Sequence, residues 1–455
     1  MMFAFLFSLA INVADVTVDP SADLGPIRPI HGVNNGPTCK GPFANLNTFK
    51  AAGIPSVRNH DASLSSEYGG QHTVDISAVF PDFDRDENDP SAYDFAFTDY
   101  CVDNVRRAGS EVYYRLGQSI EHGIKKYHIY PPKDFHKWAR VCEHVIRHFN
   151  EGWANGHHWN IRYWEIWNEA SNNATNNPTC WGGTDEQFFD FFAVAAKHLK
   201  KTFPDLMIGG PATTGWEEWS GRFLAAARKR DVPLDFFSWH GYGTTVTDMV
   251  ERAHVMRGFM NSNGYERAEN HMTEWNYVRN WDTERMYTQR VEMGDRLEKG
   301  TAYRMAMMIA LQTDTDVALA HYYDARRGTM NGMFCGVTRL PMKGYYPFYA
   351  WSKMVKLGRQ VRVSASNANA LFVTAARGTD GRIGILLCRY TYDNNVVAAE
   401  DYVIRRADGK PFGEAIGHLT DFARTYTEVP VERVKDGALR IQLYPDSFVF
   451  IEIEK

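Results

Sequence analysis

The stretch RYWEIWNEAS, at residues 162–171, gives the strongest indication of the fold. Its aromatic and β-branched residues favour a buried strand, and the polar pair Asn168 and Glu169 follows directly. A second stretch, HMTEWN at residues 271–276, has the same character and contains Glu274. Polar residues at the carboxyl ends of buried strands are typical of parallel α/β folds, which keep their chemistry there.

Outward from these two stretches, short apolar runs alternate with longer amphipathic stretches between about residues 30 and 358. This alternation indicates repeated βα units around a parallel sheet. We predict strands at residues 29–33, 56–60, 111–116, 161–168, 206–209, 234–240, 270–274 and 317–323. The clearest helices are at residues 132–149, 185–203 and 346–357, where apolar residues recur every three or four positions. The pattern therefore predicts an α/β fold with a closed (β/α)8 TIM barrel.

After Gly358 the sequence changes to short alternating strands separated by turn residues. We predict a barrel at residues 28–358 and a C-terminal all-β sandwich domain at residues 359–455, because 455 residues exceed what one hydrophobic core usually serves. Residues 1–27 form an N-terminal segment with two interpretations. The apolar start MMFAFLFSLAINVA is either part of a secretion signal, although no Lys or Arg precedes it, or a strand of the β domain.

Two glutamates are placed to act on one substrate. By the strand count, Glu169 follows the fourth strand and Glu274 ends the seventh, so the two lie on different sides of the barrel mouth. Breaking a glycosidic bond needs two facing carboxyl groups, one to protonate the leaving oxygen and one to meet the oxocarbenium-like centre. Either glutamate alone could be a solvated loop residue or an ion-pair partner, but the pair predicts a glycosidase.

Five motifs occur in a characteristic order: WEIWNEAS (164–171), CWGGTDEQFFDFF (180–192), IGGPAT (208–213), DFFSWHGYG (235–243) and TEWN (273–276). Together they resemble glycoside hydrolase family 39, and the resemblance extends over about residues 28–455. It implies a retaining mechanism in which Glu169 is the proton donor and later the base, and Glu274 is the nucleophile. Such a two-carboxylate mechanism requires no cofactor and no metal.

Electrostatics agrees with these roles. While Glu274 is ionised, its charge raises the pKa of Glu169 and keeps Glu169 protonated. Once Glu274 is esterified, the repulsion disappears and Glu169 can act as a base. Arg58, at the end of the second strand, would favour the ionised form of Glu274, or would instead form an ion pair at the barrel rim.

Further substrate-binding residues are predicted at the strand ends. Asn168 could hydrogen-bond the 2-hydroxyl of the sugar or cap its loop. His60 lies two residues beyond Arg58, so it points the same way. His240 and Tyr242 follow the sixth strand, where Tyr242 could hold the nucleophile and His240 could meet a substrate hydroxyl, or both could simply pack.

Several other residues on or near the strand ends have more than one possible role. Trp181, just before the fourth helix, could stack on a sugar or pack in the core. Tyr322 ends the eighth strand and could line the pocket, as could the two residues after it. Glu165 shares a strand and a side with Glu169 but lies four residues deeper, so we predict that it forms a buried ion pair within the barrel.

Two other classes of function compete with a glycosidase. A glycan-binding barrel without turnover would not need both carboxylates. A metal-dependent hydrolase would need ligands at several strand ends, and the histidines that could supply them are His60, His240, His271 and His321. Cys142, His144 and His148 also have a spacing that could suggest metal, but they fall on an amphipathic helix remote from the strand ends, so we predict that they pack.

Composition limits the possible partners. The formal net charge is −5, and the 50 Lys and Arg residues are scattered, which argues against nucleic acid. No apolar run approaches the roughly 18 residues of a membrane span. Aromatic residues make up 14% of the chain, which suits stacking on an oligosaccharide or glycoside substrate. Localisation stays open between secreted or periplasmic and cytoplasmic, and the oligomeric state is not predicted.

The resemblance implies an exo-acting enzyme, because β-xylosidase and α-L-iduronidase are the best-known activities of the family. An iduronidase must bind a sugar carboxylate. Few cations follow the strands apart from Arg58, although Arg279 and the pair Arg326 and Arg327 follow the seventh and eighth. We therefore predict a β-xylosidase-like enzyme that releases a terminal pentose, with iduronidase, arabinosidase or another polysaccharide hydrolase as alternatives.

Overall fold

Eight parallel strands close into a barrel, which confirms the predicted fold. The computed structural model describes residues 12–37, 44–61, 72–121, 123–173, 177–279, 298–326, 332–335, 338–366, 368 and 370–455. In order around the barrel, the strands are β2 (Gly32–Asn34), β3 (Ser56–Asn59), β4 (Glu111–Leu116), β5 (Tyr163–Ile166), β6 (Met207–Thr213), β7 (Phe236–Gly243), β8 (Glu269–Tyr277) and β9 (Val317–Tyr322).

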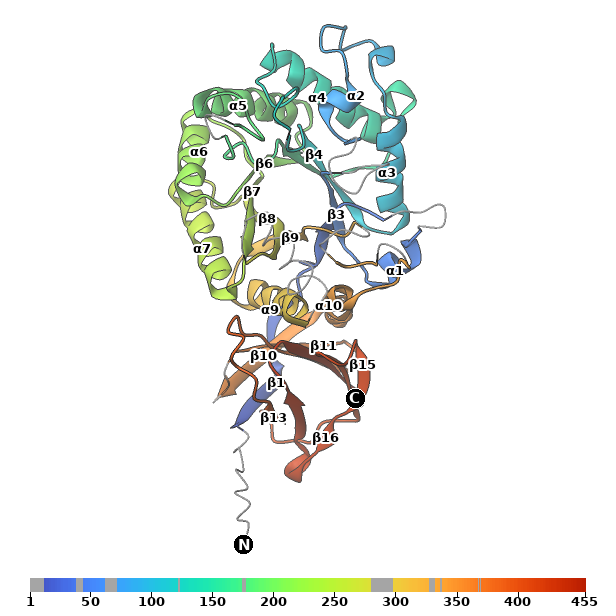
Figure 1. Ribbon diagram of the computed structural model, residues 1–455, viewed down its shortest axis with the longest axis vertical. Helices are drawn as coiled ribbons and strands as arrows, with labels where there is room; N and C mark the ends of the chain where they lie inside the picture. Colours follow the sequence, from blue (N-terminus) through green and yellow to red (C-terminus); the bar gives the residue numbers. More distant parts are fainter. Residues whose placement is uncertain are drawn as a thin grey trace.

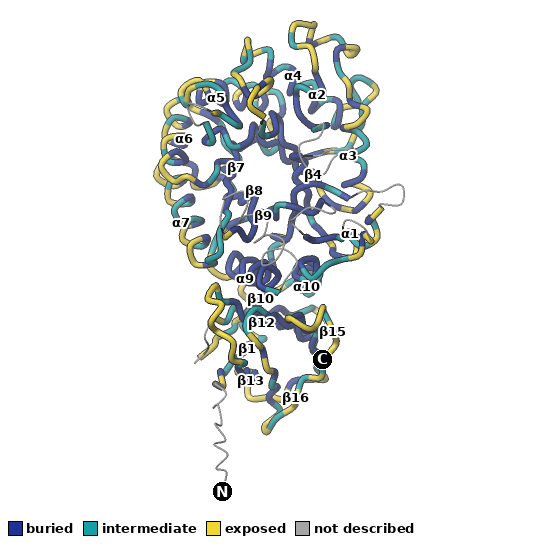
Figure 2. The backbone as a smooth tube through the Cα atoms, in the orientation of Figure 1, coloured by how far each residue is buried: buried dark blue, intermediate teal, exposed yellow. Residues whose placement is uncertain are grey.

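Helices surround the barrel on the outside (Figure 1). They are α1 (Leu46–Ala51), α2 (Ile76–Val79), α3 (Ala96–Arg107), α4 (Phe135–Glu151), α5 (Asp185–Thr202), α6 (Glu217–Lys229), α7 (Val246–Ser262), α9 (Glu298–Asp314) and α10 (Tyr346–Leu357), with short 3-10 turns η1 (Pro90–Ala92), η2 (Trp153–Asn155) and η4 (Lys343–Tyr345). A further 3-10 turn, η5 (Lys435–Gly437), belongs to the β module. Barrel strands are covered on both faces, by the barrel interior on one side and by the helices on the other. All residues of β3 and β5 are accordingly buried, and Figure 2 shows the exposed residues on the outer faces of the helices.

Local capping sets where two of the predicted helices begin. The Asp134 side chain accepts hydrogen bonds from the His136 and Lys137 amides at the start of α4. At the start of α5, Thr184 and Gln187 form a reciprocal capping box. The second cap explains why the motif with Thr184 and Gln187 leads into a helix directly after the loop that carries Glu169.

The remaining strands form one ten-stranded, nearly closed sheet beside the barrel, and the two parts lie along the long axis of the molecule (Figure 1). These strands are β1 (Asn12–Pro26), β10 (Arg359–Ser366), β11 (Leu371–Arg377), β12 (Ile383–Arg389), β13 (Glu400–Arg406), β14 (Ala415–Thr420), β15 (Thr427–Pro430), β16 (Glu432–Arg433), β17 (Leu439–Leu443) and β18 (Ser447–Ile453). The N-terminal β1 pairs with β10 on one side and β13 on the other. Residues 12–26 are therefore a strand of this module.

The described residues form three hydrophobic clusters: one between the barrel and its helices, one within the β module, and a small one of Tyr113, Tyr163 and Phe236 on the barrel strands. Helices α9 and α10 contact β11 and β12 where the two parts meet. Lys299 on α9 crosses this boundary, with its ammonium 2.8 Å from a carboxylate oxygen of Asp446 and 2.7 Å from the Thr391 carbonyl oxygen. Within the described residues, no helix combines the length and the apolar character that a membrane crossing needs.

Candidate active site

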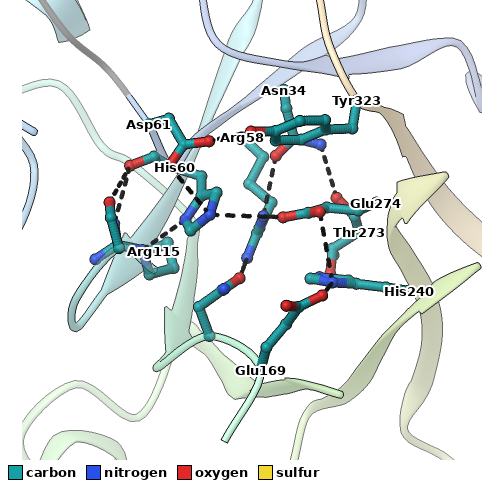
Figure 3. Close-up of polar contacts among 12 residues, drawn as sticks. Asn34, Arg58, His60, Asp61, Arg115, Glu169, His240, Thr273, Glu274 and Tyr323 are labelled. Carbon is teal, nitrogen blue, oxygen red and sulfur yellow. Dashed lines mark hydrogen bonds and ion pairs between the residues drawn. The ribbon is translucent and has the colours of Figure 1, made fainter. Parts of the chain in front are cut away.

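The carboxyl ends of β3, β5, β7 and β8 bring most of the predicted site residues together. Glu169 follows β5, Glu274 lies on β8, and His240 lies on β7 between them (Figure 3). His240 Nδ1 is 2.7 Å from Glu169 Oε1 and 3.6 Å from Glu274 Oε2. One oxygen of each carboxylate and one His240 nitrogen all lie within 4.8 Å of one another. The two glutamates therefore face the same space.

The imidazole of His240 is neutral at neutral pH, because burial lowers its pKa to about 4. A neutral ring can donate Nδ1–H to an ionised Glu169 or accept the proton of a protonated one. His240 thus tolerates both protonation states of Glu169, which a group that alternates between acid and base requires.

Arg58 is the centre of the buried polar network. It is fully buried, and its guanidinium donates to Glu165 Oε2 at 2.6 Å and to Glu274 Oε1 at 2.8 Å. It also donates to Asn168 Oδ1 at 2.8 Å and to Asn34 Oδ1 at 3.0 Å. The planar fork of an arginine can hold several acceptors in fixed directions. Glu165 forms the buried ion pair that the sequence predicts.

Glu274 receives two strong donors in a buried position. Besides Arg58, the Tyr242 hydroxyl donates to its second oxygen, Oε2. Burial raises the pKa of Glu274 above its ordinary value, while His240, Arg58 and the Tyr242 hydrogen bond act in the opposite direction. Both oxygens of Glu274 are therefore positioned by donors that favour its ionised form.

His60 lies behind Glu274 in the same network. Arg115 donates Nε–H to His60 Nδ1 at 3.0 Å, so the other ring nitrogen carries the proton. That nitrogen, Nε2, is 3.3 Å from Asp61 Oδ1 and 3.6 Å from Glu274 Oε1. Burial holds the pKa of His60 well below its ordinary value. His60 therefore points a neutral N–H towards the Arg58 side of the nucleophile, without a hydrogen bond to Glu274.

The backbone around Glu169 is strained, as functional sites often are. Trp167 and Glu169 have positive φ angles of 73° and 49°. Trp167 ends β5 earlier than predicted, and its amide donates to the Leu116 carbonyl at 2.6 Å. Gly117 permits this contact, because a Cβ there would lie 2.9 Å from Trp167 Cα. The glutamate amide donates to the Ala212 carbonyl at 2.9 Å, which anchors the turn to β6.

The structure does not place Trp181 or Tyr322 in the site. Trp181 is fully buried, its indole N–H donates to the Thr184 carbonyl at 3.0 Å, and its ring packs on Trp167. Tyr322 is also fully buried, and its hydroxyl accepts from Arg304 at 2.6 Å on the helix side of the barrel wall. Both rings thus pack in the core, which is the alternative interpretation, and sugar binding by these two side chains stays a prediction.

Some residues of the network were not predicted. Asn34, at the end of β2, donates to the Thr273 carbonyl at 2.8 Å and accepts from Arg58. Asp61 accepts from the Tyr323 hydroxyl, and Arg115 orients His60. Asn34 and Arg115 sit at or next to strand ends that the sequence identifies, so the strand-end rule could have selected them. Their partners could not be read from spacing.

A metal-dependent hydrolase would need its histidines to meet at one metal site, and His271 and His321 do not lie at the site of the two glutamates. His271 lies 3.1 Å from the Tyr113 hydroxyl and 2.9 Å from Glu269, and His321 lies 2.9 Å from the Ser56 hydroxyl. These are contacts inside the barrel wall. Among the described residues at the mouth, a cation could use only the donors of Glu169, His240 and Glu274.

A cavity of about 480 Å³ lies beside the loops that follow β5 and β6. Ser171, Asp185, Trp216, Glu217 and Arg222 are among its lining residues. Gly215 also lines it, and a Cβ there would lie 2.3 Å from the carbonyl oxygen of His240. Because Ser171 follows Glu169 by two residues, the cavity adjoins the acid/base end of the site.

Known proteins share this architecture. The model of glycosyl hydrolases family 39 matches residues 62–277, a range that includes both glutamates. A β-xylosidase of Geobacillus stearothermophilus is 26% identical over 254 residues, which cover 49% of this chain and 47% of the relative. A β-xylosidase of Caldicellulosiruptor saccharolyticus is 29% identical over 224 residues, which cover 44% and 43%. The matched segment thus spans about half the length of these relatives.

The match in three dimensions is longer. A glucosidase from Croceicoccus marinus is 20% identical with a TM-score of 0.76, and the alignment covers 97% of this chain and 99% of the other. The shared fold therefore includes the β module as well as the barrel. The barrel segment that carries both glutamates is therefore similar to glycosyl hydrolases family 39.

Proposed function

We propose that the protein is a glycosidase of the β-xylosidase type, which releases a terminal pentose from a glycan or glycoside with retention of configuration. The observation that carries this proposal is the approach of the two carboxylates to within 4.8 Å. Retaining pairs are about 5–5.5 Å apart, whereas inverting pairs leave about 6.5–9.5 Å for a water molecule. The β-xylosidase relatives support the choice of sugar.

In the first step, Glu274 attacks the anomeric carbon as the carbon–oxygen bond to the leaving group breaks. Glu169 gives its proton to the departing oxygen, and His240 stays neutral beside it. Arg58 and Tyr242 each donate to one oxygen of the Glu274 carboxylate. They hold it in place until one of these oxygens forms the ester bond. Asn168 has its amide oxygen tied to Arg58, which leaves its nitrogen to donate to the 2-hydroxyl of the sugar.

In the second step, Glu169 removes a proton from water as the water oxygen attacks the anomeric carbon. The bond to Glu274 breaks, the carboxylate returns to its two donors, and the configuration is restored by the second inversion. The proton taken by Glu169 regenerates the acid for the next cycle. No proton has to be stored on His240.

A neutral sugar is favoured over a uronic acid because the nearby cations are already paired. Arg58 has four acceptors, and Arg326 forms ion pairs with Asp324 and Asp61. Arg279 is exposed and contacts the Tyr392 carbonyl of the β module. Arg327 lies outside the described residues. The described part of the site thus offers little to compensate a sugar carboxylate.

The decisive experiment is a screen of aryl glycosides: xyloside, arabinosides, galactoside, glucoside and iduronide. We expect turnover of one pentoside, its loss in Glu274→Ala, and retention seen by NMR of the first-formed sugar. Glu169→Ala should lose about 10²–10⁴-fold on a poor leaving group and much less on a strongly activated one. Activity should survive a chelator, and turnover of the uronide alone would overturn the proposal.

A further inference from the structure

A second cluster of titratable side chains lies outside the barrel mouth. Asp99 is on α3, His148 is near the end of α4, and His157 follows η2. One ligand atom from each lies within 4.8 Å of the other two. We propose that this cluster binds a divalent transition metal, Zn²⁺ in particular, as a structural site separate from the two glutamates.

The donor atoms converge on one oxygen. Asp99 Oδ1 is 2.9 Å from His148 Nε2 and 3.2 Å from His157 Nε2. Zinc bonds to histidine nitrogen and carboxylate oxygen are about 2.0–2.2 Å long, so tetrahedral geometry sets donors roughly 3.4 Å apart. The two distances from Asp99 are slightly shorter than this spacing, and the two histidine nitrogens lie within 4.8 Å of each other. Two imidazoles with one carboxylate form a ligand set that zinc commonly accepts.

The environment of His148 favours a cation at this position. Its Nδ1 is 3.0 Å from the Trp153 carbonyl oxygen, which can only accept, so Nδ1 carries a proton. In the neutral ring, the Nε2 lone pair then faces the carboxylate of Asp99. A proton on Nε2 or a metal ion between the two atoms can supply the positive charge that they need. An Nδ1–H bonded to a carbonyl is also the usual outer support of a metal-bound histidine.

The Nε2 atom of His157 independently indicates that the cluster binds a ligand. Its Nε2 is buried and makes no hydrogen bond of good geometry to any described residue, although it lies 3.2 Å from Asp99. A buried polar atom without a hydrogen bond is costly. A metal ion at the cluster would satisfy this nitrogen.

The local fold holds both rings in place before any ion binds. His148 stacks on Phe95 with ring centroids 3.5 Å apart, and His157 stacks on Trp159 at 3.7 Å. Gly156 lets the chain turn back onto α4, because a Cβ there would lie 2.1 Å from the His148 carbonyl oxygen. The His157 amide then donates to that carbonyl at 2.6 Å.

Solvent can reach the site, which a metal requires for entry. The side chains of Asp99 and His157 are 31% and 28% exposed, whereas that of His148 is 2% exposed. Three protein ligands leave a fourth position for water. Because its ligands come from α3, from α4 and from the segment after η2, a bound ion would tie these three parts of the chain together and raise their stability.

The test is a titration of the metal-stripped, full-length protein with Zn²⁺, followed by calorimetry and thermal unfolding. We expect one equivalent to bind at the cluster and to raise the melting temperature. His157→Ala should weaken this binding by more than about 100-fold. His158→Ala, an exposed neighbour outside the cluster, is the matched control and should bind as the wild type does.

Two additional variants keep the outcome unambiguous. Glu169, His240 and Glu274 also offer three close donors, so Glu274→Gln must retain the zinc equivalent assigned to Asp99, His148 and His157. Asp99→Asn keeps the shape of the side chain if His157→Ala fails to fold, and it should lose the tetrahedral absorption bands of bound Co²⁺. Absence of Zn²⁺ binding, or binding lost in Glu274→Gln but kept in His157→Ala, would overturn the proposal.

Discussion

Glu274 is held by Arg58 and Tyr242 in surroundings where burial alone disfavours its charge. The balance between these effects decides at which pH the nucleophile is available. Since Glu274 must be ionised to attack, its pKa sets the acid limb of kcat/KM in the free enzyme. That limb should lie above the range of an ordinary solvent-exposed glutamate.

Tyr242→Phe should move this acid limb to higher pH. The Tyr242 hydrogen bond lowers the pKa of Glu274, so its removal raises the pKa further and the ionised fraction at low pH falls. The measurement is the pH profile of kcat/KM on an aryl pentoside. Tyr323→Phe is the matched control, because that hydroxyl bonds Asp61 rather than Glu274 and the limb should stay in place. A limb that stays fixed or moves down in Tyr242→Phe would contradict the assignment.

Side-chain direction along a strand could be predicted from the sequence, but the burial of individual side chains could not. The strand-end rule selects Arg58, His240 and Glu274, because side-chain alternation along a strand is a local property. It cannot tell that Trp181 and Tyr322 are enclosed by Phe191, Phe348 and other rings of distant elements. Burial depends on what the rest of the chain brings to a side chain.

At the scale of elements, Arg58 joins β3 to β2, β5 and β8 through its four acceptors. Arg58→Met should reduce the free energy of unfolding by about 3–5 kcal/mol, because it leaves Glu165 buried without its cation. Arg58→Met/Glu165→Met should recover part of that loss, since the apolar pair needs no charge compensation while buried Glu274 still lacks its cation. Denaturant unfolding measures both changes.

Measuring turnover in these two variants distinguishes the effect of Arg58 on stability from its role in orienting Glu274 and Asn168. The double variant should stay inactive, because Glu274 and Asn168 have lost the guanidinium that orients them. Recovery of turnover together with stability would show that Arg58 acts only on the fold.

The segment between β6 and α6 carries Trp216, which is 64% exposed at the cavity beside Glu169. If the leaving group extends past the proton donor, an aromatic face there suits a second sugar ring. Trp216→Ala should raise KM for a xylo-oligosaccharide by about 5–30-fold, the range expected from losing one stacking contact of about 1–2 kcal/mol. KM for an aryl xyloside should stay nearly unchanged. Equal effects on both substrates would place the leaving group elsewhere.

For the whole molecule, β1 links the start of the chain to the β module, between β10 and β13. Val16 is fully buried in this strand, while the next residue, Thr17, is partly exposed. Val16→Asp should destabilise the module by about 3 kcal/mol or more, since it places a carboxylate in an apolar core. Thr17→Asp is the matched control, and melting temperatures compare the two. Equal losses would mean that β1 is not part of the core.

Local patterns in the chain suffice to predict the order of strands and helices, the closed barrel and the strand ends that carry Glu169 and Glu274, because apolar periodicity and capping are properties of neighbouring residues. The network around Arg58, the pairing of β1 with β13 and the convergence of Asp99, His148 and His157 arise from the folded arrangement alone. These contacts join residues far apart along the chain, and their geometry exists only after the strands have packed in register.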